Sequence, residues 1–247
     1  MIDEILSLVD KHEEWRGKKC LNLIPSENVM SPSVRRLLSS ELGHRYTARD
    51  RFYMGTRFID EIEEYGEKIA KEMFKADTAD LRPLSGHIAD LIFLANFSKP
   101  RDTFMCVSPE DGGYPGMWNE GLAGLLGLKA VAFPFSKNDM NIIVEEAEET
   151  IRRVKPKVVV FGASLITFPH PVKELAKIAK EYGACVGFDG SHVLGLPLYP
   201  LKIASCALML PSTISSGGSH LGNFISFHLI CRSPLWALQQ NRHLWVQ

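Results

Sequence analysis

The feature that most constrains this sequence is an alternation of short apolar runs with amphipathic stretches between residues 103 and 188. Four runs rich in β-branched or apolar residues have the length of buried strands: 103–107, 129–133, 157–161 and 184–188. Stretches with helical spacing of apolar residues, such as 144–154 and 172–182, separate these runs. This alternation predicts an α/β fold, in which a mainly parallel sheet has helices on both faces. Ligands then bind at the carboxyl ends of the strands.

The residues before this pattern are expected to be helical. Residues 2–15 carry apolar side chains at helical spacing, and Ser31-Pro32 supplies a helix start with proline in its first turn. The same spacing predicts a helix from Ile59 to Phe74 and another from Ile88 to Phe97.

The composition changes after Gly195. Residues 196–247 contain three basic residues and none of the 29 acidic residues of the chain. Together with the helical spacing of the first residues, this change predicts three parts: an N-terminal helical segment over residues 1–40, a large ligand-binding domain over 41–195, and an atypical tail over 196–247. The tail is expected to be out of frame or degenerate.

The charge balance excludes several classes of partner. With 28 basic and 29 acidic residues, the formal net charge is -1, which predicts no nucleic-acid partner.

No apolar run reaches the roughly 18 residues of a membrane span, and the N-terminus is too acidic for a signal peptide. The five cysteines are widely spaced and form no CxxC pair, so no metal site is indicated. We expect a cytoplasmic protein that does not bind membranes and whose ligand is a small molecule.

Asp189 is the first candidate for chemistry, because it follows the last predicted strand. A carboxylate there can pair with a protonated ring nitrogen, an interaction worth roughly 5 kcal/mol at about 3 Å before desolvation is subtracted. The same side chain can instead cap the next turn. His192 lies three residues further on and is by itself equally compatible with an ordinary loop histidine.

Ser85, Gly86 and His87 form the second candidate, because they open a predicted helix. The free N–H groups of a helix start, a hydroxyl and a glycine together can bind a phosphate group. Serine is also a routine helix cap, so this signal is weak alone. The order of the two features suits a cofactor with a phosphate at one end and a pyridine ring at the other.

Several motifs give the chain a family resemblance over about residues 15–195. They are LNLIPSENVMSPSVRRLLSS, RYTARDRFYMGTRFIDEIE, LRPLSGHIAD and FGASLITFPHPVKELAKIAKEYGACVGFDGSHVLG. Their sequence and order resemble those of the serine hydroxymethyltransferase family. The resemblance implies the aminotransferase-like fold and a pyridoxal 5'-phosphate cofactor. It also implies one-carbon transfer between serine and tetrahydrofolate through a pyridoxal-phosphate aldimine.

The resemblance also assigns roles to residues near the cofactor. The implied cofactor-binding residues are Ser85, Gly86, His87, Ser164, Asp189 and His192. In this assignment Ser85 and Gly86 hold the phosphate, with His87 beside them. Ser164 reaches the phenolic oxygen of the ring and Asp189 pairs with the pyridine nitrogen. His192 lies near the ring substituents and is counted among the catalytic residues.

The substrate side of the implied site lies earlier in the chain. Ser26 would lie by the carboxylate of the amino acid substrate, and Tyr46 and Tyr53 would act as substrate-binding and catalytic residues. In the family, the counterpart of Tyr53 belongs to the active site of the neighbouring subunit. The resemblance therefore implies a homodimer.

Three departures from the family pattern put the activity in doubt. Ala48 stands where the family has an acidic residue that contacts folate, and Asp111 stands where it has a histidine stacked on the cofactor ring. Ser215, in Ser212-Thr213-Ile214-Ser215, stands where Ser-Thr-His-Lys supplies the Schiff-base lysine. Serine cannot form an imine, so we expect impaired turnover.

The family's small C-terminal domain is also expected to be absent. An altered reading frame, a fragment of a longer enzyme, and a paralogue that has lost the chemistry all fit these departures. Two other functions remain open. One is a folate-independent aldolase or lyase acting on β-hydroxy amino acids, and the other is a non-catalytic homologue that binds a ligand or pairs with an active subunit.

Overall fold

The structure is a computed structural model that describes residues 2–23, 31–48, 52–74, 76, 78–193 and 224–226. Its N-terminal part is helical, as the sequence predicts. The helices are α1 (Ile2–Glu14), continued by a π-helical turn (Trp15–Lys19), α2 (Pro32–Leu38) and α3 (Arg57–Phe74). Ser31 caps α2 by accepting a hydrogen bond from the backbone N–H of Val34, and Pro32 occupies the first turn.

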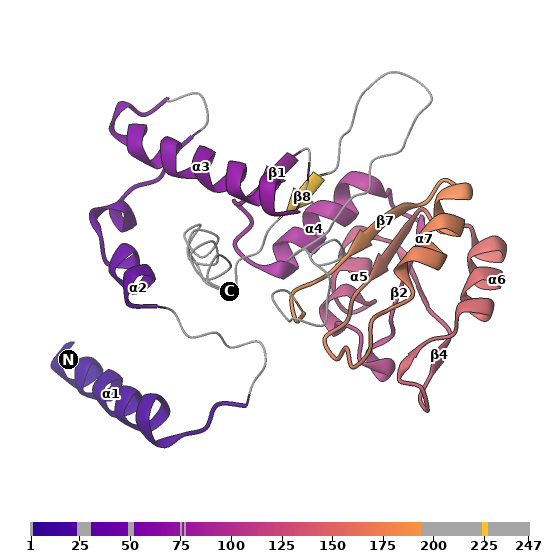
Figure 1. The fold of residues 1–247 in the computed structure, drawn as a ribbon, viewed down its shortest axis with the longest axis horizontal. Coiled ribbons are helices and arrows are strands. Elements are labelled where there is room, and N and C mark those ends of the chain that lie inside the picture. The colour runs from indigo at the N-terminus through magenta and orange to yellow at the C-terminus, as the bar shows by residue number, and fades with distance from the viewer. Residues whose placement is uncertain are drawn as a thin grey trace, which may run out of the picture.

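A four-stranded sheet forms the centre of the fold. Its strands are β2 (Thr103–Cys106), β3 (Lys129–Ala132), β6 (Val158–Phe161) and β7 (Cys185–Phe188). They are ordered β3-β2-β6-β7, and every neighbouring pair is parallel. The predicted α/β fold is confirmed, and each strand lies within one of the four apolar runs (Figure 1).

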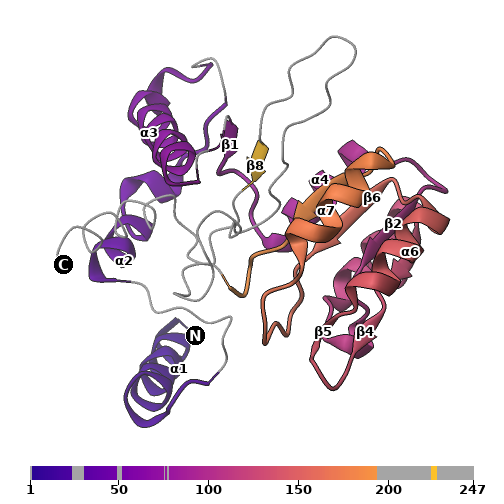
Figure 2. The same ribbon diagram turned by 45° about the vertical axis from the view of Figure 1, so that its right-hand side comes forward.

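Helices cover both faces of this sheet. One face packs against α4 (Gly86–Phe97) and α5 (Leu122–Leu126), and the other against α6 (Val144–Val154) and α7 (Val172–Glu181) (Figure 2). Strand side chains alternate between the two cores, so that Phe104 and Cys106 face α4 while Met105 faces α6 and α7. Each fully buried side chain of this size contributes roughly 1.5–3 kcal/mol.

Two small sheets were not predicted from the sequence. Strands β4 (Phe135–Ser136) and β5 (Asn141–Ile142) form an antiparallel pair. Strand β1 (Thr78–Asp80) pairs in parallel with β8 (Phe224–Ser226). The β8 strand belongs to the tail over 196–247, and the rest of that tail lies outside the described residues.

The N-terminal helices bury few of their apolar residues. Helix α1 has no buried residue, and its apolar residues Ile2, Ile5, Leu6, Leu8 and Val9 are all exposed. Both views show α1 set apart from the sheet (Figures 1 and 2). Within the described part of the chain, no helix has the length and apolarity needed to cross a membrane.

Candidate functional site

The loops that follow β2, β6 and β7 meet at the carboxyl edge of the sheet. The backbone N–H of Leu165 donates a hydrogen bond to the carbonyl of Gly112 over 3.0 Å, and that of Asp189 donates to the carbonyl of Phe161 over 2.8 Å. Gly162 has a positive φ of 98°, and a Cβ added there would lie 2.1 Å from the carbonyl oxygen of Asp189. Only glycine permits this approach, which fixes Asp189 beside the end of β6.

Asp189 is a buried carboxyl group directly after β7, with 9% of its surface exposed. Its Oδ1 accepts hydrogen bonds from the backbone N–H of Ser191 at 3.0 Å and from Ser191 Oγ at 2.6 Å. Asp189 therefore caps the following turn, as one of the two sequence interpretations expects. Its Oδ2 makes no hydrogen bond within the described residues, so the carboxylate can still accept one from a ligand.

Two residues close to Asp189, Asp90 and His192, each have an unpartnered buried polar atom. Of the described residues, three have a buried side-chain polar atom without a hydrogen-bond partner: Asp60, Asp90 and His192. His192 is three residues from Asp189, and the charge of Asp189 acts on Asp90. Because buried polar atoms are normally hydrogen-bonded, the unpartnered atoms of Asp90 and His192 mark positions that a polar ligand can fill, whereas Asp60 lies on α3, away from this edge.

The start of α4 supplies a second set of donors. Ser85 Oγ accepts a hydrogen bond from the backbone N–H of Ile88 at 3.1 Å, so Ser85 is the cap of the helix. Its hydroxyl hydrogen is free to bond a ligand. The backbone N–H groups of Gly86 and His87 lie in the first turn and have no intrahelical acceptor. A helix start of this kind favours an anion.

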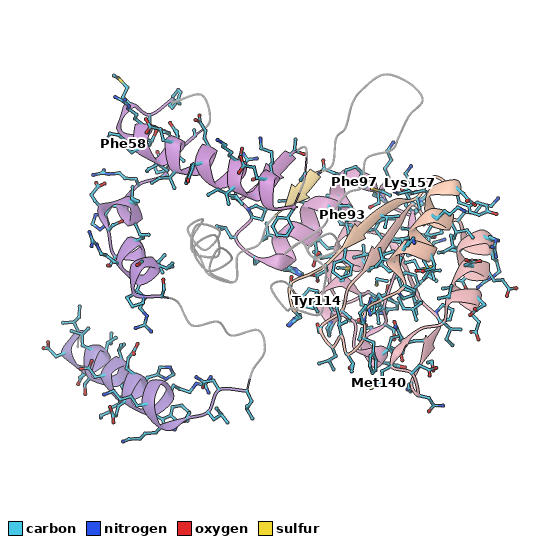
Figure 3. All side chains as sticks on the ribbon, in the orientation of Figure 1. Phe58, Phe93, Phe97, Tyr114, Met140 and Lys157 are labelled. Carbon is cyan, nitrogen blue, oxygen red and sulfur yellow. The ribbon has the colours of Figure 1, made fainter. Side chains whose placement is uncertain are left out.

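Tyr114 connects the start of α4 with Asp189. Its hydroxyl lies 3.2 Å from Nδ1 of His87, and the two rings meet edge to face at 5.8 Å. Burial raises the pKa of Tyr114, and the negative charges of Asp90 and Asp189 add to this effect. Tyr114 lies at the end of the sheet opposite Lys157, which precedes β6 (Figure 3). The helix start thus contacts Tyr114, and the carboxylate of Asp189 lies within electrostatic range of the same side chain.

Two buried polar residues, Asp90 and His170, were not predicted from the sequence. Asp90 is 1% exposed within the apolar helix α4, and burial, followed by the charge of Asp189, raises its pKa well above the usual range. The backbone N–H of Gly162 donates a hydrogen bond to Nδ1 of His170 at 3.3 Å, and burial lowers the pKa of His170 to about 4. An acid inside an apolar helix was the one signal that sequence alone offered for Asp90.

Two other predicted residues lie at or near the edge. Ser164 is half-buried in the loop after β6, next to Leu165, whose N–H binds the carbonyl of Gly112. Asp111, which replaces the stacking histidine of the family, accepts a hydrogen bond from Ser108 Oγ at 2.8 Å and stabilises its own turn.

The predicted substrate residues lie apart from this edge. Tyr46 and Tyr53 join their hydroxyls at 3.1 Å before the start of α3, and 72% of Tyr46 is exposed. Figure 1 shows the start of α3 at the far end of that helix from the sheet. The structure therefore does not bring the two tyrosines to Asp189 within one chain. Ser26 and Ser215 lie outside the described residues.

Known proteins resemble this chain over most of its sequence. A family model described as serine hydroxymethyltransferase matches residues 1–206. Proteins named serine hydroxymethyltransferase from Thermococcus kodakarensis and Pyrococcus abyssi are 45% and 44% identical over 197 residues, which cover 78% of this chain and 46% of each relative. One from Methanopyrus kandleri is 40% identical over 198 residues, 79% of this chain and 46% of the relative. The chain thus spans less than half the length of these curated relatives.

Proposed function

The chain belongs to the serine hydroxymethyltransferase family, and from this membership we propose that its sheet edge binds pyridoxal phosphate for one-carbon transfer between serine and tetrahydrofolate. We further propose that this transfer is impaired here, because Ser215 replaces the lysine that bonds the cofactor in the family. The observation that carries the proposal is the buried carboxylate of Asp189, which shares a tyrosine neighbour with the start of α4.

The residues present at this edge fit the two ends of the cofactor. The phosphate is an anion, and the N–H groups of Gly86 and His87, with the hydroxyl of Ser85, are donors at the positive end of a helix. The protonated pyridine nitrogen is a cation, and Asp189 Oδ2 is an available acceptor. The orphan Nδ1 of His192 offers a further polar contact to the ring substituents.

These side chains would bind and orient the cofactor. When bound, pyridoxal phosphate supplies the electron sink for cleavage of the serine Cα–Cβ bond. Asp189 would hold a proton on the pyridine nitrogen through its negative charge, and its own position is fixed by Ser191 and Gly162. Ser164 would donate a hydrogen bond to the phenolic oxygen. Burial of Asp189 strengthens its charge interaction because water screens it less.

The missing lysine is the reason to expect slow turnover. An amine held against the bound aldehyde provides an effective molarity of about 10⁵ M or more, which corresponds to roughly 7 kcal/mol, and serves as a proton carrier. The hydroxyl of Ser215 does neither at neutral pH. We therefore propose that the chain binds the cofactor reversibly and converts serine to glycine slowly.

Restoring the lysine tests this function. The wild type, Ser215→Lys and the neighbouring control Ser216→Lys are incubated with pyridoxal phosphate and reduced with borohydride, and the cofactor-labelled peptide is identified by mass spectrometry. We expect label at residue 215 in Ser215→Lys alone, together with a gain in tetrahydrofolate-dependent formation of glycine from serine. A wild type as fast as Ser215→Lys would refute the impairment. Cofactor binding without turnover in every variant would favour a non-catalytic homologue.

A second function is favoured by Ala48. This half-buried residue occupies the place of the acid that contacts folate in the family, and it has no group to bind folate. Cleavage of β-hydroxy amino acids without folate needs no such acid. Glycine formed by Ser215→Lys at the same rate with and without tetrahydrofolate would support this aldolase or lyase function over one-carbon transfer to folate.

We also propose a homodimer as the functional unit. Tyr46 and Tyr53 are separated from Asp189 within the chain, and the apolar face of α1 is exposed. A second copy would cover these surfaces and bring the two tyrosines to the sheet edge of its partner. Sedimentation equilibrium of the chain should give twice its mass, and a monomer at all concentrations would refute this arrangement.

A further inference from the structure

Asp90 is a buried acid to which the proposed function assigns no role. It lies four residues after Gly86, so the two residues share one side of α4 near its start. Its neighbours in the helix, Ala89, Phe93 and Leu94, are buried and apolar. A carboxylate in such surroundings is costly unless it is paired, yet Oδ1 of Asp90 has no hydrogen-bond partner.

The titratable groups around Asp90 come from three further elements of the described chain. Phe93 and Leu94 of α4 pack in one cluster with Cys106 at the end of β2 and with the ring of Tyr114. Cys106, Tyr114 and Asp189 all lie within electrostatic range of Asp90. His87, three residues earlier on α4, lies against Tyr114. None of the ion pairs in the described residues joins a lysine or arginine to Asp90 or Asp189.

Two carboxyl groups that share a buried site without a basic partner cannot both ionise readily, because their like charges repel. The hydrogen bonds around them decide which one keeps the proton. Asp189 accepts two from Ser191, which stabilises its ionised form, whereas Asp90 accepts none at Oδ1 and is the more deeply buried.

We propose that Asp90 and Asp189 form one carboxyl pair that carries a single negative charge, with the proton on Asp90 and the charge on Asp189. Asp90 is then a positioning residue, because it acts on the ligand through Asp189 and through the charge of the site. When Asp90 is neutral, the site holds one negative charge, on Asp189, which can pair with the single positive charge of the protonated pyridine ring. It also keeps a second negative charge away from the N–H groups that would bind the phosphate.

The pair can be tested without any ligand. Folded Asp90 keeps a proton that the unfolded chain releases above the ordinary pKa of an aspartic acid, about 4. Stability from this group is therefore complete below that pKa and falls as the pH rises toward the higher folded pKa. Urea unfolding across this pH range should show the fall in the wild type and not in Asp90→Asn. Asp189→Asn should reduce the fall, and the double variant should match Asp90→Asn.

The assignment of the proton is tested by cofactor affinity and rests on the proposed function. Asp90→Asn replaces a neutral acid by a neutral amide, so the dissociation constant for pyridoxal phosphate should stay within about threefold of wild type. Asp189→Asn removes the charge and should weaken binding at least about tenfold. Asp139→Asn, an exposed acid in the β4–β5 turn, is the control for charge, and Leu94→Ala is the control for stability.

The two experiments separate the possible failures. If Asp90→Asn keeps the alkaline fall in stability, or if Asp189→Asn leaves it unchanged, the carboxyl pair is refuted. If Asp90→Asn weakens binding and Asp189→Asn does not, the proton lies on Asp189 and the proposal is overturned. A chain that binds no pyridoxal phosphate refutes the proposed function, while the unfolding experiment still decides whether the pair exists.

Discussion

The N-terminal helices and the sheet domain differ in what covers their apolar residues. Helix α1 has a row of apolar residues at helical spacing and buries none of them. In the sheet domain, Phe104 and Phe161 are completely buried, as are Ile151 of α6 and Leu175 of α7. Both regions have regular patterns in the sequence, but the apolar residues of α1 stay exposed, whereas those of the sheet domain pack against one another.

This difference in burial indicates which region provides most of the stability and holds the candidate site. The sheet fixes Asp189 and the loop after β6 through buried contacts on both faces. The N-terminal region, which carries Tyr46 and Tyr53, has fewer buried apolar residues, and the apolar residues of α1 are exposed. A matched substitution should therefore have unequal effects in the two regions.

The largest difference is expected for two phenylalanines. Phe161 is 0% exposed and stacks on Phe133 at 5.2 Å, whereas Phe58 on α3 is 67% exposed (Figure 3). Phe161→Ala should lower the free energy of unfolding by about 3–5 kcal/mol because it leaves a cavity. Phe58→Ala should change it by less than about 0.5 kcal/mol. Urea denaturation measures both free energies of unfolding. Equal losses in the two variants would contradict the difference in burial between the two regions.

Two glycines provide the next matched pair. A Cβ at Gly162 would lie 2.1 Å from the carbonyl oxygen of Asp189, and the positive φ adds strain, whereas a Cβ at Gly55 meets no atom within 4 Å. Gly162→Ala should cost about 3 kcal/mol or more, and Gly55→Ala less than about 0.5 kcal/mol. Thermal unfolding of the two variants checks this. A Gly162→Ala variant as stable as wild type would contradict the close approach of the ends of β6 and β7.

His170 should make the sheet domain sensitive to acid. Its pKa is lowered to about 4 in the folded chain, so the unfolded chain binds the proton first as the pH falls below about 6.5. Stability should therefore fall by about 3 kcal/mol between pH 6.5 and pH 4 and change no further from this group below that range. His170→Gln should lose this part of the pH dependence in urea unfolding. His12→Gln, on exposed α1, should retain it.

The smallest effect is expected where the N-terminal segment is attached to α3. Thr47 Oγ1 donates a hydrogen bond of 2.6 Å to Asp60 Oδ1, and Asp60 Oδ2 is already unpartnered. Thr47→Val should lower the free energy of unfolding by about 1–2 kcal/mol, because the carboxylate of Asp60 loses this hydrogen bond. Thr47→Ser should restore most of the loss. A valine variant as stable as wild type would show that this contact does not anchor the segment.

The sequence predicted the fold well because its signals are local. Each β-branched run became a strand, and Ser31 and Ser85 became the caps of α2 and α4. Asp189 was found because a polar residue directly after a buried strand stands out. Periodicity carries no such information on which elements pair, so the charge interaction between Asp90 and Asp189 was not predictable. The short strands β4 and β5 were missed because two residues give no periodic signal.

The most direct test of the account is whether Ser85 and Asp189 hold opposite ends of one cofactor. The affinities of wild type, Ser85→Gly and Asp189→Asn are measured for pyridoxal phosphate and for pyridoxal, which lacks the phosphate. Glycine keeps most of the helix cap, so Ser85→Gly should weaken pyridoxal phosphate alone, by about tenfold, whereas Asp189→Asn should weaken both ligands. An equal effect of Ser85→Gly on both ligands, or no effect of Asp189→Asn on either, would contradict the account.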